Sequence, residues 1–441
     1  MADVIRTRRR KPPKPPVTVE VRLGDWATRG SVGAELEGRH ILVDRGIPGE
    51  SAVALVDRRR APWRGIALEI LLASPDRVAP PCAYFLQNCG GCQWQHLSYE
   101  AQLKAKGRLV DREMHTAGVD ARVAEVHPMA NPWRYRRTAA IALGWEAGFR
   151  PQGRRGIVEV HDCLISHPLI GLLADRLNRL LQSRLLPCYH GKIWLDCTVV
   201  GMDHDPGLQI LIQGIEGLTL ESHPELPDVA RTLGSIEGVW SVAYRHRSGE
   251  PRPLLGDLMS TIEVAGRPVY VPAGSFFQTN IQMLLLVLRR MSEALGSRHV
   301  GSAADIYGGV GTLGLALAPQ VDTMTLVELD ALAVSAARRT AAEWKLDNVS
   351  CVPLHAERAL PELPPLDLAI VDPPRSGLGE RVVTSLVANG APFVLYLSCA
   401  PASLARDLAS LQTAGYRVTT LEIFDFYPHT YHVESLAILE R

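Results

Sequence analysis

The last third of this 441-residue chain alternates short apolar runs with helical segments, and this alternation constrains the fold most. From about residue 269 the apolar runs are SAADIYG, TMTLVELD, LDLAIVD and PFVLYLS. Continuous apolar strands joined by helices predict an α/β fold of the Rossmann-like kind, with a parallel sheet covered on both faces. The chain closes with YRVTTLEIFDF and HVESLAILER. Because their connection is too short for a helical crossover, the last strand is expected to run antiparallel.

The length of the chain exceeds one ordinary core, so two or three domains are expected. Residues 1–16 hold six Lys or Arg, one Asp and four prolines, which predicts a disordered basic arm. Residues 17–80 carry short β-rich runs broken by Gly and Pro, which predicts an OB-like β-barrel, with a generic β module as the alternative. Residues 81–268 are expected to form a mixed central domain, and residues 269–441 the α/β domain.

Composition excludes several functional classes. The 47 basic and 47 acidic residues cancel, so any nucleic-acid surface must be local. One candidate is the loop at residues 57–64, where four arginines and Trp63 suit phosphate contact with base stacking, although a solvated charged loop fits nearly as well. No stretch approaches the length of a membrane span or a signal peptide. We therefore expect a soluble, cytoplasmic monomer without a membrane partner.

Ligands of open α/β sheets bind beyond the carboxyl ends of the strands, so the residues at those ends are informative. The first run leads into the glycine-rich segment 305–314, which lets a ligand approach the backbone and the next helix N-terminus. The second run ends in Glu328, whose carboxylate can accept the hydroxyls of a ribose. Gly309, Gly311 and Gly314 also match the GxGxxG pattern, so a nicotinamide or flavin dinucleotide is the rival ligand.

The next two strand ends favour a methyltransferase over a dinucleotide enzyme. One strand ends in Asp372-Pro-Pro-Arg375, and the two prolines fix a rigid turn that positions the carboxylate against a ligand. Nucleotide-base methyltransferases have such a turn at the reacting base, and a plain helix-breaking turn is the alternative. The other strand ends in Cys399, directly before a helix. A free cysteine is most often a small buried apolar residue, but a helix N-terminus lowers a thiol pKa and makes it a candidate nucleophile.

A thiolate at this edge fits methylation of a pyrimidine at carbon 5. Carbon 5 is too weak a nucleophile to take a methyl group from S-adenosylmethionine directly. Thiolate addition at carbon 6 turns the base into an enolate that can. A base must then remove the carbon 5 proton so that the cysteine is eliminated. The terminal strand offers His432 and Glu434 for this step.

Four cysteines suggest a metal site. Cys82, Cys89 and Cys92 crowd together and Cys163 lies downstream, and such a cluster in a reducing compartment indicates metal before disulfides. The spacing suits an iron–sulfur cluster or a structural zinc ion, and we favour iron–sulfur because CGGC without a second close pair is unusual for zinc ribbons. A radical enzyme that cleaves S-adenosylmethionine at an open iron is a third option, but it leaves the glycine turn and Cys399 without a task.

In combination these motifs resemble the RNA 5-methyluridine methyltransferases, in particular the multidomain bacterial type that acts on large-subunit ribosomal RNA. The resemblance covers nearly the whole chain after the arm. It rests on seven motifs in order, namely CGGCQWQHLSYEAQL, VPAGSFFQTN, DIYGGVGTLGL, VELDALAVSAARRT, IVDPPRSGL, LYLSCAPASLARDL and HVESLAILER. It implies a TRAM RNA-binding domain at residues 17–80, a seven-stranded methyltransferase sheet at the C-terminus, and a [4Fe-4S] cluster on the four cysteines.

The resemblance also implies roles for single residues. Cys399 corresponds to the nucleophile and Glu434 to the base that abstracts the proton. The residues implied to contact the methyl donor S-adenosylmethionine are Gln278, Tyr307, Glu328 and Asp372. The implied partner is RNA, with 23S rRNA favoured over the tRNA T-loop, which related enzymes modify.

The sequence departs from the family pattern at three places. Six residues separate Cys82 from Cys89 where five are more usual, Ala400 stands where Asn is common, and Thr312 stands where some members have Asn. None of these changes removes a reacting group. A catalytically silent RNA-binding or iron–sulfur protein is the non-enzyme alternative, but the intact Cys399 and Glu434 argue against it. A dinucleotide-dependent oxidoreductase would leave the DPPR and SCAP motifs unexplained.

Overall fold

The computed structural model describes residues 15–247 and 249–441, which form two compact units. The first unit takes the residues up to Pro81 together with Cys92–Ala105 and His429–Tyr431; the second takes Cys82–Gly91, Lys106–Pro428 and His432–Arg441. The basic arm expected at residues 1–16 falls outside the described residues, except for its last two positions.

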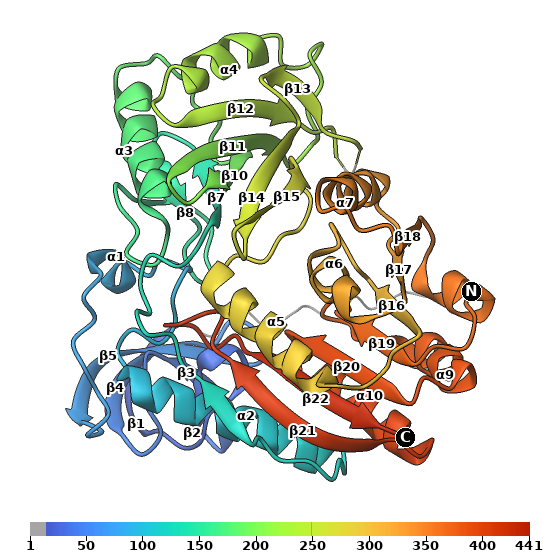
Figure 1. The fold of residues 1–441 in the computed structure, drawn as a ribbon. Helices are drawn as coiled ribbons and strands as arrows, with labels where there is room; N and C mark the ends of the chain where they lie inside the picture. Colours follow the sequence, from blue (N-terminus) through green and yellow to red (C-terminus); the bar gives the residue numbers. More distant parts are fainter. Residues whose placement is uncertain (1–14, 248) are drawn as a thin grey trace, which may run out of the picture. The chain divides into compact units, whose positions relative to one another are not determined.

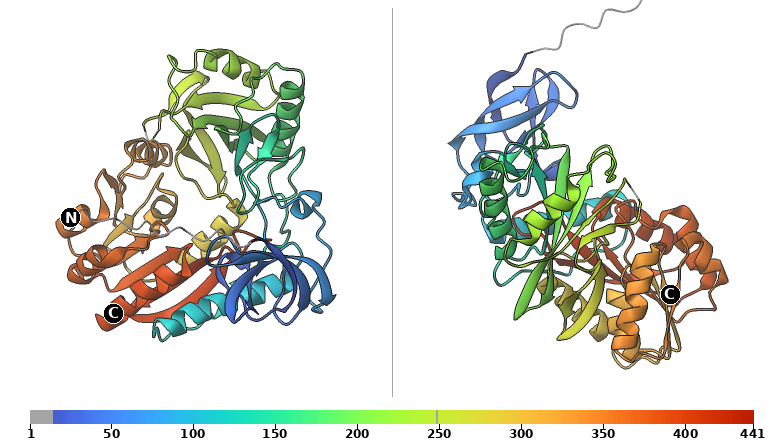
Figure 2. Two further views of the ribbon diagram at one scale, coloured as in Figure 1. Left: turned by 180° about the vertical axis from the view of Figure 1, so that it is seen from behind. Right: turned by 90° about the horizontal axis from the view of Figure 1, so that it is seen from above.

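The first unit contains a five-stranded sheet, blue in Figure 2, in the order β1-β4-β5-β3-β2. Its strands are β1 (Val17–Arg22), β2 (Val32–Leu36), β3 (Arg39–Asp44), β4 (Ser51–Asp57) and β5 (Arg64–Leu72). All neighbours are antiparallel except β3 and β5. Every second residue of β4 is buried, as the alternating apolar pattern requires. These strands agree with the β-rich segment expected at residues 17–80, and its assignment as a TRAM domain stays a prediction.

Two later segments complete the first unit. Trp94 is fully buried, donates from Nε1 to the Gly30 carbonyl at 3.0 Å, and packs on Trp26 with ring centroids 4.7 Å apart. Gln102 donates to the Leu97 carbonyl at 2.9 Å and accepts from the His429 amide at 2.8 Å. The residues after Cys92 and the short segment around His429 are therefore bonded into this unit.

The second unit contains a nine-stranded sheet. Its strand order is β13-β12-β11-β10-β7-β8-β9, and the β14–β15 pair joins it at β10. Its strands are β7 (Thr138–Leu143), β8 (Ala147–Phe149), β9 (Val158–Glu159), β10 (Ile193–Met202), β11 (Asp205–Gly214), β12 (Val239–Tyr244), β13 (Arg252–Leu255), β14 (Met259–Val264) and β15 (Arg267–Pro272). The helices α3 (Pro168–Gln182) and α4 (Leu226–Gly234) share one apolar core with it.

The second sheet of this unit has eight strands, in the order β18-β17-β16-β19-β20-β22-β21-β6 (Figure 1). They are β6 (Glu125–His127), β16 (Ser302–Ile306), β17 (Thr323–Val327), β18 (Val349–Val352), β19 (Leu368–Val371), β20 (Phe393–Ser398), β21 (Arg417–Phe424) and β22 (Glu434–Glu440). The five strands from β18 to β20 are parallel, and β22 runs antiparallel to both of its neighbours. The predicted parallel sheet with an antiparallel last strand is thus confirmed.

The strand count differs from the expected seven. The extra strand is β6, which lies in the segment expected to form the central domain and pairs in parallel with β21. A long β21 offers a free edge with unpaired backbone groups, and β6 satisfies three residues of it.

Helices cover both faces of this sheet. Those with sheet side chains in a common core are α2 (Tyr99–Thr116), α8 (Ala356–Ala359), α9 (Gly379–Asn389) and α10 (Pro401–Thr413). The remaining helices are α1 (Ala83–Leu86), α5 (Ile281–Leu295), α6 (Thr312–Leu317) and α7 (Ala331–Glu343). None of the helices in the described part of the chain combines the length and the apolar character that a bilayer crossing needs.

Candidate active site

The motif-bearing loops meet at one edge of the eight-stranded sheet. The strands β17, β16, β19 and β20 are neighbours and parallel, so their carboxyl ends point the same way (Figure 1). The glycine-rich turn, Glu328, the DPPR turn and Cys399 follow these four ends. This is the edge at which open α/β sheets bind their ligands.

The glycine-rich turn after β16 has a backbone that few residues can adopt. Tyr307, Gly309 and Gly311 have φ angles of 66°, 56° and 86°. A Cβ at Gly314 would lie 2.6 Å from Leu326 Cδ2 and 2.8 Å from Asp305 Cβ, so only glycine lets α6 pack this closely on the sheet. A Cβ at Gly309 would meet nothing within 4 Å, which leaves open space for a ligand beside this turn.

Glu328 is fixed by backbone amides. Its Oε2 accepts from the Gly309 amide at 3.0 Å, and its Oε1 accepts from the amides of Leu329 and Asp330 at 2.7 and 2.8 Å. A carboxylate has about four acceptor positions, so it can still accept from the hydroxyls of a ribose. The carboxylate expected to bind ribose is therefore held in a defined orientation next to the glycine turn.

Asp372 and Gln278 come together although 94 residues separate them. Gln278 Nε2 donates to Asp372 Oδ2 at 3.3 Å, and the buried Gln278 Oε1 has no hydrogen-bond partner among the described residues. Burial and the neighbouring Asp305 raise the pKa of Asp372 to about 7. The pair therefore offers an unused acceptor and a carboxyl that is partly protonated near neutral pH.

The turn that follows Asp372 is held by α10. Ser403 Oγ donates to the Arg375 carbonyl at 2.8 Å, and Arg406 donates to the Ser376 carbonyl at 2.6 Å. Asp407, which is buried, accepts from the Leu378 amide at 2.7 Å. The sequence analysis missed Asp407, because an acidic residue within a helical segment carries no local sign that it faces a turn.

Cys399 directly follows β20, and Glu434 begins the neighbouring strand β22. The antiparallel register of β20 and β22 pairs Ser398 with Ser435, so the next step places Cys399 opposite Glu434. Cys399 is partly exposed and Glu434 is buried. The structure thus brings together the two residues that the sequence analysis predicted as nucleophile and base.

The thiol of Cys399 does not have the lowered pKa expected from its place before a helix. Burial first, and then the carboxyls of Glu434 and Asp372, raise the pKa of the thiol to about 11, and Arg375 opposes them. That expectation is therefore wrong, because burial and two acidic neighbours outweigh the N-terminus of α10. The thiol is protonated at neutral pH and must lose its proton to react.

Glu434 is a buried carboxyl with one unsatisfied oxygen. Burial and Asp372 raise the pKa of Glu434 well above its usual range, against the effect of Arg375, and its Oε1 has no hydrogen-bond partner among the described residues. His432, the other candidate base, has its pKa lowered to about 4 by burial and by nearby cations. His432 is thus neutral near pH 7, and the raised pKa of Glu434 makes its carboxylate the stronger proton acceptor of the two.

Asp305 is a third buried carboxyl that the sequence analysis passed over. Its Oδ2 accepts from the Gly314 amide at 2.8 Å, and its Oδ1 has no partner among the described residues. Burial raises the pKa of Asp305 to about 7. The sequence feature that could have identified Asp305 is an acidic residue near the end of an otherwise apolar strand.

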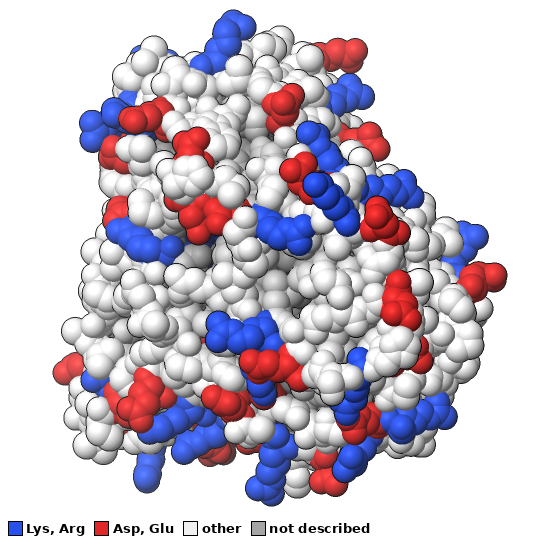
Figure 3. Space-filling model, viewed as in Figure 1, with Lys and Arg blue, Asp and Glu red and all other residues white. Residues whose placement is uncertain are grey.

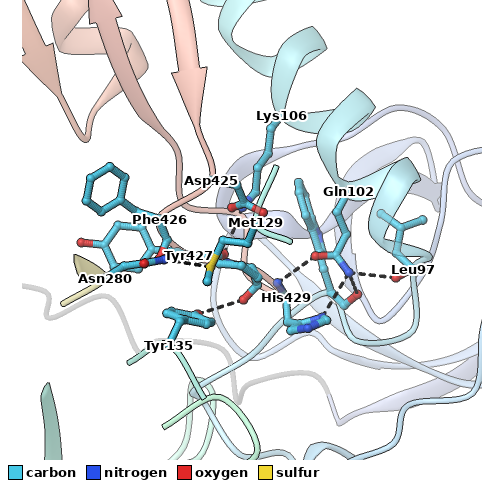
Figure 4. A network of polar contacts seen from close by, with 12 residues as sticks. Leu97, Gln102, Lys106, Met129, Tyr135, Asn280, Asp425, Phe426, Tyr427 and His429 are labelled. Atoms are coloured by element: carbon cyan, nitrogen blue, oxygen red, sulfur yellow. Dashed lines mark hydrogen bonds and ion pairs between the residues drawn. The ribbon is translucent and has the colours of Figure 1, made fainter. Parts of the chain in front are cut away.

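The chain segment between β21 and β22 is held by side chains from three distant parts of the second unit (Figure 4). Lys106 Nζ lies 2.5 Å from Asp425 Oδ1 and donates to the Tyr427 carbonyl at 3.0 Å. Asn280 donates to the Phe426 carbonyl at 3.1 Å, and Tyr135 donates to the Pro428 carbonyl at 3.0 Å. We call Lys106, Asp425, Asn280 and Tyr135 the loop brace. It fixes three successive carbonyls of the chain that leads to Glu434.

Three of the four predicted metal ligands are electrostatic neighbours in the second unit. Burial first, and then the thiols of Cys163 and Cys82, raise the pKa of Cys89 to about 11. Cys92 belongs to the first unit. Among the described residues, only Glu125, His127 and Glu422 bring three His, Cys, Asp or Glu ligand atoms within 4.8 Å of one another. That group is an ion-pair network, because both oxygens of Glu422 accept from Arg290.

Trp63 cannot serve the base stacking considered for the loop at residues 57–64. Its side chain is only 7% exposed, and the guanidinium groups of Arg39 and Arg58 lie 5.1 and 5.9 Å from its ring centroid. Arg58 also bonds Glu37, and Arg59 bonds Asp57. That interpretation is corrected, since the indole is covered and three of the four arginines are paired, Arg64 with Asp44.

A solved structure identifies the class of fold. The tRNA (uracil-54, C5)-methyltransferase of Pyrococcus abyssi, solved in complex with S-adenosyl-L-homocysteine, matches this chain with a TM-score of 0.72. The match covers 96% of this chain and all of that one at 23% identity. The fold of this chain is therefore that of this methyltransferase.

Sequence comparisons identify the family. Residues 365–441 match the family model of tRNA (Uracil-5-)-methyltransferase. An uncharacterized RNA methyltransferase of Thermosynechococcus vestitus is 30% identical, over 96% of this chain and 98% of its own length. The 23S rRNA (uracil(1939)-C(5))-methyltransferase of Chromohalobacter salexigens is 29% identical, over 93% of this chain and 86% of its own. The chain belongs to the RNA uracil-5-methyltransferase family, and it is an enzyme.

Proposed function

We propose that this enzyme transfers a methyl group from S-adenosylmethionine to carbon 5 of a uridine in 23S rRNA, through covalent addition of Cys399 to carbon 6. The observation that carries the proposal is that Cys399, directly after β20, has the carboxyls of Glu434 and Asp372 as electrostatic neighbours. A pyrimidine held at this place would present carbon 6 to the thiol and the carbon 5 proton to the carboxyl.

The donor site is proposed at the glycine-rich turn. Glu328 would accept from the ribose hydroxyls, and the open space at Gly309 would admit the adenosine. The unused Oε1 of Gln278 would accept from the amino group of the methionine part, with Tyr307 and Asp372 completing the contacts. The bound donor supplies an electrophilic methyl group, and these residues hold and orient it.

The order of proton transfers follows from the pKa values. Cys399 must give up its thiol proton as its sulfur bonds to carbon 6, and Asp372, with its pKa raised to about 7, is the nearby carboxyl that can take it. After methyl transfer, ionised Glu434 takes the carbon 5 proton. The bond between sulfur and carbon 6 then breaks and Cys399 leaves as the thiolate.

Ribosomal RNA is the proposed substrate. The relative from Chromohalobacter salexigens is named for position 1939 of 23S rRNA and aligns over most of both chains. The tRNA T-loop is the second candidate, because the matching family model and the solved Pyrococcus abyssi enzyme are both named for tRNA. The first unit, with its five-stranded sheet, is proposed as a TRAM domain that binds this RNA.

The four cysteines are proposed to hold a [4Fe-4S] cluster. A single zinc ion bonds each sulfur at about 2.3 Å, which places tetrahedral sulfur ligands about 3.8 Å apart. Cys82, Cys89 and Cys163 influence one another electrostatically, yet their sulfur atoms do not all lie within 4.8 Å. This wider spacing of partly buried thiols supports a multi-iron cluster over one zinc ion. The cluster would brace this part of the fold, because no reaction step consumes an electron.

The mechanism is tested with RNA that contains 5-fluorouracil. Fluorine cannot leave as a cation, so labelled donor and this RNA should give a protein–RNA adduct that survives denaturation. The adduct should be absent in Cys399→Ala and present in the matched control Cys351→Ala, whose thiol is also partly exposed. Transcripts of 23S rRNA and of tRNA, used in parallel, distinguish the two substrates. Failure of both RNAs to form an adduct would sink the mechanism.

A further inference from the structure

Trp145 has the largest exposed fraction of any large apolar side chain in the described residues. It is 73% exposed and lies in the turn between β7 and β8. Trp240, on the same sheet, is 42% exposed, but a Cβ at Gly201 or Gly207 would lie within 2.6 Å of its ring, so Trp240 packs against two glycines. Packing against these glycines explains why Trp240 stands at this position. It does not explain why the indole of Trp145 faces solvent.

The neighbours of Trp145 hold it in place. Its ring meets the ring of His190 edge to face, with centroids 5.5 Å apart and an angle of 85° between the planes. The next residue, Gly191, donates to the Leu143 carbonyl at 2.7 Å and accepts at its carbonyl from the guanidinium of Arg150. The turn with Trp145 and the turn with His190 are therefore fastened together, and the indole is a fixed surface.

Basic residues flank this surface. The loop between β8 and β9 carries Arg154 and Arg155, which are exposed and make no ion pair with any described residue. The end of the loop reaches the Trp145 turn, because Ile157 Cδ1 lies 2.8 Å from the position of a Cβ on Gly144. Lys and Arg are otherwise mixed with Asp and Glu over the face shown in Figure 3, so attraction of a polyanion depends on local groups such as this one.

The base of the arginine loop is anchored to the segment that carries Cys89. The Gly90 amide donates to the Arg150 carbonyl at 3.0 Å, and the Gln152 amide donates to the Asn88 carbonyl at 3.0 Å. These bonds, with the bridge between Cys89 and Pro151, make a short two-stranded ladder. The two arginines thus project from a loop with a defined base.

We propose that Trp145, Arg154 and Arg155 bind an unpaired nucleotide of the RNA substrate. The indole would stack on the base, and the two guanidinium groups would contact the flanking phosphates. A nucleobase is the occupant that fits, because RNA presents unpaired bases for stacking on aromatic side chains and its phosphates attract arginines that have no carboxylate partner. The inference rests on the proposed function in that it takes RNA as the substrate.

The test measures binding of an unmodified 23S rRNA transcript to the full-length enzyme. Trp145→Ala should raise Kd about tenfold, since stacking of one base has about this effect, and Trp145→Phe should restore most of the affinity. The matched control is Leu185→Ala, which removes another side chain that is 65% exposed. Because Trp145 is exposed, its replacement should leave the unfolding transition unchanged. An unchanged Kd for Trp145→Ala would overturn the proposal.

The arginines are tested by the salt dependence of binding. The double variant Arg154→Gln/Arg155→Gln should lower the slope of log Kd against log salt by about 0.7 to 0.9 for each lost phosphate contact. The control is Arg231→Gln on α4, which should leave the slope unchanged. An unaltered slope in the double variant would exclude phosphate contacts at this loop.

A cross-link locates the nucleotide and separates this inference from the proposed function. RNA with 5-bromouridine should cross-link to a peptide that contains Trp145, and a cross-link pattern without that peptide would contradict the inference. All Trp145 variants should still form the Cys399 adduct with 5-fluorouracil RNA at saturating concentration. Loss of the adduct in the parent enzyme would refute the mechanism alone, while weaker binding by Trp145→Ala would still support this site.

Discussion

Two groups of buried charged side chains in the second unit are built in opposite ways. At the strand-end site, Asp305, Asp372 and Glu434 crowd together, and Asp305 and Glu434 each keep an oxygen without a hydrogen-bond partner among the described residues. In the loop brace, Lys106 and Asp425 are both fully buried but oppositely charged and in contact. Only Asp425 Oδ2 lacks a partner there.

This difference in pairing distinguishes side chains that take part in proton transfer from side chains that hold a chain segment in place. Burying a carboxyl without a counter-charge raises its pKa and costs stability, so a fold keeps such carboxyls where proton transfer needs them. A buried ion pair with further hydrogen bonds holds a segment in one geometry. The loop brace fixes the segment next to Phe424, and Phe424 pairs with Glu434 in the sheet. The loop brace, with its buried ion pair, thus positions the segment that leads to the buried carboxyl of Glu434.

Glu434→Gln should have the largest effect, because it leaves the site its shape and removes its proton acceptor. The variant should still add Cys399 and transfer the methyl group, but it should fail to release RNA, so turnover falls by about 10²–10⁴. Denaturing gels would then show a methylated protein–RNA complex that accumulates with time. The unfolding free energy should not fall, because burial raises the pKa of the Glu434 carboxyl and glutamine fills the same buried space without a charge. Rapid turnover would exclude Glu434 as the base.

Lys106→Met breaks the ion pair of the loop brace and should mainly lower the free energy of unfolding. It leaves Asp425 buried without a counter-charge, which costs about 3–5 kcal/mol of unfolding free energy. The double variant Lys106→Met/Asp425→Leu should recover most of this loss, since no lone charge remains. Urea denaturation measures both. Equal destabilisation by the single and double variants would show that the charge pair is not what holds the loop.

Asp305→Asn tests the unpaired carboxyls of the strand-end site through the pH dependence of the unfolding free energy. The folded-state pKa of Asp305 is raised to about 7, so its contribution to stability is fully present below its unfolded pKa and is lost as pH rises through 7. Each pH unit in that window removes about 1.4 kcal/mol for each such carboxyl. The unfolding free energy of Asp305→Asn should therefore fall less steeply between pH 4 and 7 than that of the parent enzyme. Parallel pH profiles would contradict the raised pKa.

Ala400→Asn should have the smallest effect. Ala400 is the N-cap of α10 and offers no side-chain cap, whereas the brace leaves no carbonyl of residues 426–428 without a donor. An Asn at this position could accept from the first free amides of the helix and should raise the unfolding free energy by about 1 kcal/mol. Thermal unfolding measures the gain, and Ala400→Gly should fall only a few tenths of a kcal/mol short of it. Destabilisation by Asn would mean that the cap position is closed to a larger side chain.

The sequence predicted what depends on local pattern. Apolar runs and helical segments identified the parallel sheet, and motifs at strand ends placed the glycine turn, Asp372 and Cys399 at one edge. The pairing of Cys399 with Glu434 depends on the register of β20 and β22, which only the family resemblance suggested. The loop brace draws on residues 106, 135, 280 and 425, and no local pattern connects positions so far apart.

Two expectations failed for the same physical reason. The thiol pKa of Cys399 was expected to be lowered by the adjacent helix, and Trp63 was expected to be available for stacking beside its arginines. Both arguments used near neighbours in the sequence. Burial and distant partners decided otherwise, since carboxyls from other strands surround Cys399 and the arginine from β3 covers Trp63.

The first unit is assembled from three separate segments of the chain, and this limits how the gene can be rearranged. Its sheet ends by residue 72, but Trp94, which fills the space against Gly30, and the segment from His429 to Tyr431 are encoded far downstream. A fragment cut after residue 81 would lack the indole that bonds Gly30 and packs on Trp26. Recombination at a single boundary therefore cannot exchange this unit between enzymes as a cassette, and we expect its three pieces to be inherited together.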